Sequence, residues 1–282
     1  MSFDNLLLER DGAVALLTIN RPQVLNALNS ATIDDLRRAL LEVRRDDGVR
    51  AAVITGAGEK SFCSGMYVTE AAKKTEEKGR TEGYTIFKPW TDMMQSIRKP
   101  FICAVNGYCV GGGWHLVADS DIVIASEKAQ FFDTHVNIGL INGVEAAGFA
   151  WKMPLGILMR MVIEGRHYRV SAQQALQWGL VSEVVPPEAL MDKAWEIATH
   201  IAEDAAPLAV QAKQAKATGR RDQLRIELLP GVLAPAAGRC GWWVHGSTIH
   251  GQGTNNRPSS SARPGVPTDG RRREGRPRAR DG

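Results

Sequence analysis

Three short apolar segments constrain the fold of this chain more than any other feature of its sequence. They are residues 51–55, 101–105 and 121–125. Segments of this length and composition are typical of strands covered on both faces, as in parallel sheets. Residues 14–19 are predicted to form a further strand. Residues 30–45 show the helical spacing of apolar residues, with Ser30 as the candidate N-cap. The sequence therefore predicts an α/β fold with helical crossovers.

The end of the chain has a different composition from the rest. Residues 231–282 contain nine Arg, no Lys and three acidic residues, so the remainder of this +4 chain is slightly acidic. A slightly acidic body gives no electrostatic reason to expect a nucleic-acid partner. The segment shows no helical or strand periodicity, and its Arg, Gly, Pro and Ala are what GC-rich codons yield in a wrong frame. We expect it to be disordered or frameshifted, which translation of the genomic DNA in its other frames would test.

Other sequence features narrow the expected environment. No apolar run approaches the length of a membrane-spanning helix, and the first ten residues carry acids rather than the basic region of a signal peptide. The four cysteines follow neither disulfide nor metal spacing. We therefore expect a reduced, cytoplasmic protein with no membrane partner and no metal site.

Two glycine-containing turns are the candidate chemical features. Gly111, Gly112 and Gly113 follow an apolar strand and precede a helical pattern, so backbone N–H groups at the helix start could bind an oxyanion. A tight turn with close packing explains the triplet equally well. Gly65 ends an earlier strand and frees the N–H of Met66 in the same way. Two such loops facing each other could hold one carbonyl oxygen.

In this order, the motifs resemble those of the crotonase superfamily, the enoyl-CoA hydratase/isomerase family, over about residues 5–218. The matching segments are residues 19–28, 53–58, 62–65, 104–108, 111–113 and 179–181. The resemblance implies a crotonase-like spiral of ββα units over residues 1–200. It implies a helical C-terminal region, beginning here at residues 201–230 and altered by the tail of residues 231–282. It also implies a homotrimer or a dimer of trimers, which the altered C-terminus puts in doubt.

The resemblance also implies a substrate and a binding site. An acyl-CoA would place its thioester oxygen between the N–H groups of Met66 and Gly112, with an enolate as the shared intermediate. Coenzyme A would arrive as part of the substrate, with no tightly bound cofactor. The expected lining of the CoA channel is Gln23, Val24, Leu25, Ala27, Ser64, Gly65, Met66, Tyr67 and Val68.

The chain departs from the family pattern at its catalytic positions. His115 and His135 stand where hydratases of the family carry two glutamates, and Tyr67 stands where an aspartate is usual. Histidine titrates near neutral pH and can act as acid or base, so the pair is either a working site or a relic. Glu145 is the remaining candidate acid, and its alternative role is to favour a helix start.

Three functional interpretations follow. The first is an acyl-CoA-processing lyase or isomerase that uses the histidine pair for proton transfer. Because neutral imidazole has a single acceptor, we expect poor hydration of simple enoyl-CoAs. The second is a CoA-independent hydrolase that cleaves cyclic β-diketones by a retro-Claisen route, since such relatives use histidine near the position of His135. The third is a catalytically degenerate acyl-CoA binder.

Overall fold

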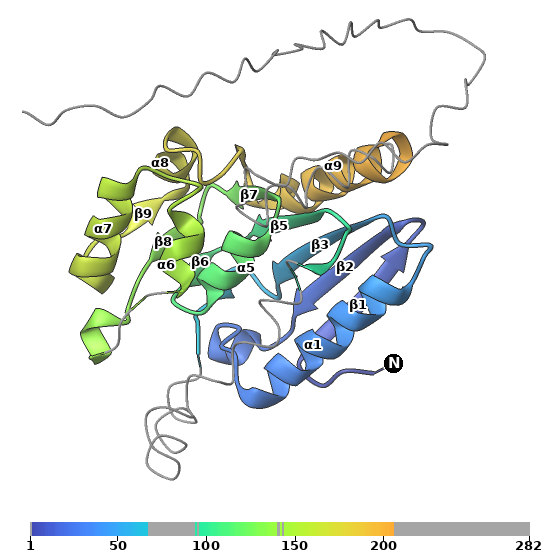
Figure 1. Ribbon diagram of the computed structural model, residues 1–282, viewed down its shortest axis with the longest axis horizontal. Helices are drawn as coiled ribbons and strands as arrows, with labels where there is room; N and C mark the ends of the chain where they lie inside the picture. Colours follow the sequence, from blue (N-terminus) through green and yellow to red (C-terminus); the bar gives the residue numbers. More distant parts are fainter. Residues whose placement is uncertain (1, 67–93, 95, 140–141, 143, 206–282) are drawn as a thin grey trace, which may run out of the picture. The chain divides into compact units, whose positions relative to one another are not determined.

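A computed structural model describes residues 2–66, 94, 96–139, 142 and 144–205. The chain divides between Glu227 and Leu228 into two units, and every described residue lies in the first. Figure 1 shows this unit as strands with helices packed around them. The expected C-terminal helical region, residues 201–230, is described only to residue 205. The tail of residues 231–282 lies outside the described residues.

The larger sheet has six strands in the order β1-β2-β3-β5-β7-β10. Strand β1 runs antiparallel to β2, and the remaining neighbours are parallel. The strands are β1 (Leu6–Asp11), β2 (Val14–Ile19), β3 (Ala51–Gly56), β5 (Phe101–Val105), β7 (Ile122–Ser126) and β10 (Glu183–Val185). The parallel core predicted from the apolar segments is therefore confirmed, with β7 beginning one residue later than expected.

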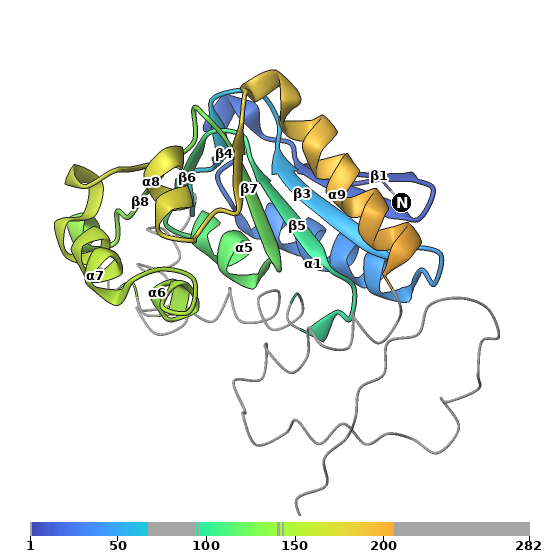
Figure 2. The same cartoon turned by 90° about the horizontal axis from the view of Figure 1, so that it is seen from above.

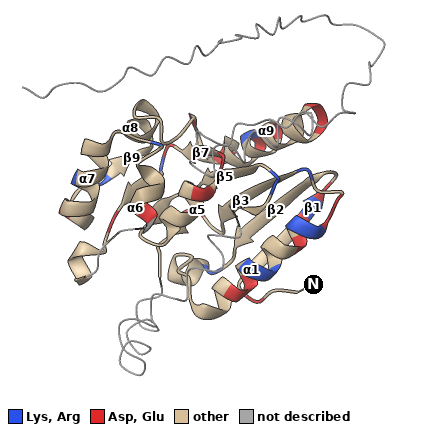
Figure 3. Cartoon of the chain, in the orientation of Figure 1, with Lys and Arg blue, Asp and Glu red and all other residues tan. Residues whose placement is uncertain are grey.

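Both faces of this sheet are buried, which explains the apolar sequence of its central strands. The covering helices are α1 (Ser30–Arg45) and α9 (Leu190–Asp204). Along β3, Ala52 and Ile54 join the hydrophobic cluster that contains residues of α1, whereas Ala51 and Val53 join the cluster that contains residues of α9. Figure 2 shows the two helices on opposite sides of the strands. Figure 3 shows β3 and β5 without charged residues, while α1 carries several.

A second, smaller sheet positions the glycine turns. Its order is β4-β6-β8-β9, with bounds β4 (Ser61–Cys63), β6 (Tyr108–Val110), β8 (Gln130–Phe132) and β9 (Val170–Ser171). The strand pairs β3–β4, β5–β6 and β7–β8 each contribute one strand to each sheet, which is the repeated unit of the spiral. Because β4 and β6 are parallel neighbours, the turns that follow them lie side by side.

The helices begin and end where their sequences provide signals, with one correction. The side chain of Asn29, not the predicted Ser30, caps α1 by accepting a hydrogen bond from the Thr32 N–H at 2.8 Å. The other helices are α5 (Gly113–Asp119), α6 (Val144–Phe149), α7 (Leu155–Glu164) and α8 (Ala172–Gln177). The short 3-10 turns are η1 (Pro22–Val24), η2 (Val136–Ile138), η3 (Gly165–His167) and η4 (Pro187–Ala189).

Three cysteines lie inside the fold as free thiols: Cys63, Cys103 and Cys109. Burial raises the pKa of Cys63 to about 12 despite a hydrogen bond with the Gly65 backbone. Burial likewise raises the pKa of Cys103 and of Cys109. These thiols therefore behave as small apolar groups in the core.

Candidate active site

Two glycine turns meet at the carboxyl ends of β4 and β6. Gly65 has a φ of +89° and Gly111 a φ of +46°, values that favour glycine. A Cβ added at Gly65 would lie 2.9 Å from the carbonyl oxygen of Val110 and 3.0 Å from the nitrogen of Gly112. A Cβ added at Gly112 would lie 3.4 Å from the nitrogen of Met66. A side chain at Gly65 would therefore clash with the turn that carries Gly112, whereas a Cβ at Gly112 would make only ordinary contact with the turn of Met66.

The direction of two N–H groups follows from the hydrogen bonds of their own peptides. In a trans peptide the C=O and the next N–H point in opposite directions. The Gly65 carbonyl accepts from the N–H of Leu28 at 2.7 Å, so the Met66 N–H points away from that neighbouring segment. The Gly111 carbonyl accepts from the Trp114 N–H at 2.8 Å in the first turn of α5, so the Gly112 N–H points away from that helix.

Helix α5 places the first predicted histidine against the predicted acid. His115 is 5% exposed, and its Nε2 lies 3.1 Å from Oε1 of Glu145, in the first turn of α6. The two helices are held together by Trp114 and Phe149, whose rings stack with centroids 4.5 Å apart. Trp114 is fully buried, so it belongs to the core, while Trp151 is 88% exposed.

The second predicted histidine follows β8 and faces the same carboxylate. Nε2 of His135 lies 3.6 Å from Oε1 of Glu145, and its Nδ1 lies 2.6 Å from Oδ1 of the buried Asp133. A Cβ added at Gly111 would lie 3.5 Å from Cε1 of His135, so the imidazole packs against the glycine turn. The structure thus brings His115, His135 and Glu145 together beside the turn that carries the Gly112 N–H.

The electrostatics of this site favour the charged forms of His135 and Glu145. Burial alone would lower the pKa of His135, but its hydrogen bond to Asp133 and the charges of Asp133 and Glu145 outweigh burial and raise that pKa. Burial alone would raise the pKa of Glu145, but the hydrogen bond and charge of His115, with the charge of His135, lower it. Glu145 is therefore an anion at neutral pH, beside a histidine whose protonation is favoured.

The segments expected to line a CoA channel lie side by side. The N–H of Ser64 donates to the carbonyl of Leu25 at 3.1 Å, next to the bond from Leu28 to Gly65. Asn26, buried with a φ of +56°, anchors this loop by donating to the Ser61 carbonyl at 2.7 Å. Gln23 and Leu25 are exposed, whereas Ala27 is buried. Tyr67 and Val68 lie outside the described residues.

Two residues of the cluster were not predicted as site residues. Asp133 precedes His135 by two positions, a spacing that raises the question of contact without answering it. Asn142 begins an Asn-Gly pair, which by itself signals only a turn, and its side-chain amide donates to Oδ1 of Asp133 at 3.0 Å. Within the described part of the chain, no group of three His, Cys, Asp or Glu side chains forms a potential metal site.

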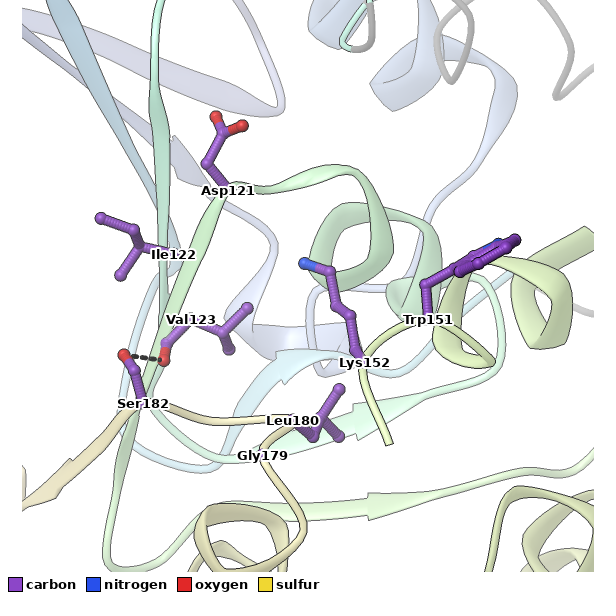
Figure 4. Close-up of a pocket in the computed structure, with 8 residues that line it drawn as sticks. All are labelled: Asp121, Ile122, Val123, Trp151, Lys152, Gly179, Leu180 and Ser182. Carbon is purple, nitrogen blue, oxygen red and sulfur yellow. Dashed lines mark hydrogen bonds between the residues drawn. The ribbon is translucent and has the colours of Figure 1, made fainter. Parts of the chain in front are cut away.

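A separate hollow of about 250 Å³ lies away from this cluster (Figure 4). Its lining residues are Asp121, Ile122, Val123, Trp151, Lys152, Gly179, Leu180 and Ser182. The Lys152 ammonium donates to the carbonyls of Val117 and Ser120 at the end of α5, at 2.8 and 2.5 Å. This lysine therefore caps the helix that carries His115.

Solved structures of the same fold define the class of this protein. An enoyl-CoA hydratase/isomerase from Mycobacterium paratuberculosis matches with a TM-score of 0.68 and 40% identity, over 77% of this chain and 83% of that one. An enoyl-CoA hydratase from Bacillus anthracis matches with a TM-score of 0.71 and 32% identity, over 77% and 83% of the two chains. The chain is an enzyme of the crotonase fold.

Sequence comparisons then identify the family. The family model for enoyl-CoA hydratase/isomerase matches residues 9–228, and the chain belongs to this family. The short-chain-enoyl-CoA hydratase of Clostridium acetobutylicum is 35% identical, over 85% of this chain and 90% of that protein. The (E)-benzylidenesuccinyl-CoA hydratase of Thauera aromatica is 41% identical, over 76% and 82%. No helix among the described residues is long and apolar enough to cross a membrane.

Proposed function

We propose that this enzyme acts on an acyl-CoA and stabilises its thioester enolate between the N–H groups of Met66 and Gly112. The observation that carries the proposal is the approach of the two glycine turns, each with an N–H directed away from the hydrogen bond that the preceding carbonyl accepts. Fixed backbone donors of this kind each contribute about 3–4 kcal/mol to a transition state that develops negative charge on oxygen. Both a lyase and an isomerase of this family would use such an enolate.

The neighbouring cluster supplies acid–base groups for this chemistry. The Asp133 carboxylate accepts a hydrogen bond from Nδ1 of His135. The neutral ring therefore has its lone pair on Nε2, which faces Glu145. We infer that a water or an acidic C–H is held beside Nε2 of His135 and Oε1 of Glu145, while His115 contacts that same oxygen and supports the carboxylate. His135 then accepts a proton, and its protonated form returns one.

The relatives support coenzyme A as the substrate carrier. Their names include an enoyl-CoA hydratase, a benzylidenesuccinyl-CoA hydratase and a carnitinyl-CoA dehydratase, which differ in acyl group but share the CoA thioester. The adjacent segments at Gln23–Ala27 and Ser64–Met66 are the proposed walls of the CoA channel, with Tyr67 and Val68 as predicted extensions. No tightly bound cofactor is required for this chemistry.

The test combines binding and turnover. We expect acetoacetyl-CoA, an enolisable thioester, to bind in calorimetry with one site per subunit, and enoyl-CoA substrates to be hydrated or isomerised in a spectrophotometric assay. His135→Gln should retain binding and lower kcat by about a hundredfold or more. His167→Gln, an exposed histidine in η3, is the matched control and should change neither. Absence of acetoacetyl-CoA binding by the wild type would contradict the proposal.

A second candidate function rests on the contact between Asp133 and His135. A carboxylate-backed histidine also suits activation of water for attack on a ketone, as in retro-Claisen cleavage of a β-diketone. A cyclic 1,3-dione therefore forms a parallel arm of the same assay. Turnover of the dione without binding of acyl-CoA would favour this function. Binding of acyl-CoA that no histidine variant alters, without turnover of either substrate, would favour a degenerate binder.

A further inference from the structure

We propose that Asp133 and Asn142 are positioning residues that fix the tautomer and direction of the His135 imidazole, so that its Nε2 is the proton-exchanging atom facing Glu145. The proposal rests on the acyl-CoA function proposed above only for its catalytic consequence. It extends the acid–base cluster by two residues that lie behind the imidazole.

The first step is the hydrogen bonding of Asp133. This side chain is fully buried, and two of the groups that contact its oxygens are donors in any state, the Asn142 amide and the His135 backbone N–H. Oδ1 accepts from the Asn142 amide at 3.0 Å and lies 2.6 Å from Nδ1 of His135. Oδ2 accepts from the backbone N–H of His135 at 3.3 Å. Because a carboxylate only accepts, Nδ1 of His135 carries a proton in every protonation state of the ring.

Asn142 links Asp133 to the start of α6 through two hydrogen bonds. Its amide nitrogen donates to Asp133, and its Oδ1 accepts from the Ala146 N–H at 2.9 Å, in the first turn of α6. The residue before Ala146 is Glu145. Asn142 therefore ties the carboxylate that orients His135 to the helix that carries the facing carboxylate, and it is itself 5% exposed. A buried amide with both ends bonded fixes the relative position of the two groups.

This arrangement leaves Nε2 of His135 as the ring atom that can exchange a proton. In the neutral ring Nε2 is a bare acceptor, and it lies 3.6 Å from Oε1 of Glu145, another acceptor. Two acceptors at this distance repel each other weakly, and a proton on Nε2 turns that repulsion into attraction. The described titratable groups around this gap are Asp133 behind the ring, Glu145 in front of it and His115, whose Nε2 contacts the same Oε1 of Glu145. Asp133 thus favours a proton at Nε2.

The test observes the tautomer and the titration of the His135 imidazole by nitrogen-15 NMR. In protein labelled with nitrogen-15 histidine, we expect His135 to be the Nδ1–H tautomer when neutral. Asp133→Asn should move its titration to lower pH and lower kcat by about a hundredfold with KM unchanged. Asp133→Ala should convert the neutral ring to the Nε2–H tautomer, because Nδ1 then has no acceptor and Glu145 remains one. Asp35→Asn is the matched control, a buried carboxylate on α1 that accepts from Asn5.

The outcomes separate this proposal from the proposed function. An unchanged titration and tautomer of His135 in folded Asp133 variants would overturn it, as would equal effects of Asp35→Asn. If the Asp133 variants do not fold, Asn142→Ala keeps the carboxylate and removes the link to α6. It should lower kcat and broaden the His135 resonances, and a rigid ring with wild-type kcat would overturn the proposal. If the wild type turns over no acyl-CoA but the tautomer shifts as expected, positioning stands and the proposed function fails.

Discussion

At the scale of single residues, the site is a short line of ionisable groups with one buried end. Asp133 is fully buried, His135 lies between it and Glu145, and His115 closes the line on α5. The sequence predicted the two histidines and Glu145, because glycine landmarks placed them. It could not predict that Asp133 begins this line or that Asn142 hydrogen-bonds Asp133, since short-range spacing does not fix the direction of a side chain.

The first prediction at this scale concerns pH and stability. The pKa of Glu145 lies below its ordinary value of 4.5, so its stabilising contribution is present above pH 4.5 and is lost as pH falls through the lowered pKa. The pKa of His135 lies above 6.5, so its contribution is present below pH 6.5 and is lost as pH rises through the raised pKa. Urea unfolding across this range should show the largest deficit of Glu145→Gln between pH 4.5 and 6.5. A deficit independent of pH would contradict this.

The second prediction concerns the glycine turns. Gly65→Ala would place a methyl group 2.9 Å from the Val110 carbonyl in addition to straining a backbone with positive φ. Gly12→Ala has the strain, with a φ of +54°, but no atom within 4 Å. We expect each to lose about 1–2 kcal/mol of unfolding free energy through strain. Gly65→Ala should lose further unfolding free energy through the contact with Val110. It alone should also lower the affinity for acetoacetyl-CoA in calorimetry. Equal affinity in both variants would argue against the role of this turn.

At the scale of secondary-structure elements, strand length separates what the sequence predicts from what it does not. The strands at 14–19 and 101–105 and the helix at 30–45 have the predicted bounds, because each is long enough to show a period or a continuous apolar run. Strands β4, β6 and β8 have three residues each, too few for a period, and β1 ends in charged residues at the edge of its sheet. Those short strands carry the site.

The prediction at this scale concerns the contact between α5 and α6. Trp114→Ala would remove the ring stacked on Phe149 and cost about 3–5 kcal/mol of unfolding free energy. Because these helices carry His115 and Glu145, kcat should fall under conditions in which the variant remains folded. Trp195→Ala, on α9 at the other face of the larger sheet, should reduce stability and leave kcat unchanged. Unchanged kcat in Trp114→Ala would show that the stack has no role in positioning the cluster.

At the scale of the whole molecule, the notable surface feature is an exposed apolar stripe on α7. Leu155, Met159 and Ile163 lie four residues apart on α7 and are 61%, 47% and 65% exposed, with the exposed Trp151 just before them. Val136 of η2, which packs beside α7, is also exposed. Contiguous apolar surface of this kind marks an interface. We propose that a second copy of the chain covers it in the expected trimer.

Sedimentation velocity tests this interface. The wild type should sediment as a trimer or a dimer of trimers, and Leu155→Asp combined with Ile163→Asp should sediment as a monomer, because charges would be buried at the contact. Leu7→Asp is the control, since Leu7 is 44% exposed on β1 and outside the stripe. A wild-type monomer, or a double variant that keeps the wild-type assembly, would refute the assignment of α7 to the interface.

The buried thiol of Cys63 can report how often the protein opens transiently. Cys63 ends β4, and a Cβ added at Gly113 would lie 3.4 Å from its sulfur. With its pKa raised to about 12, this thiol should react with an alkylating reagent only in molecules whose glycine turns have momentarily separated. Peptide mapping of the Cys63 label over time would therefore measure how often the two glycine turns separate. A bound thioester should lower the rate of labelling.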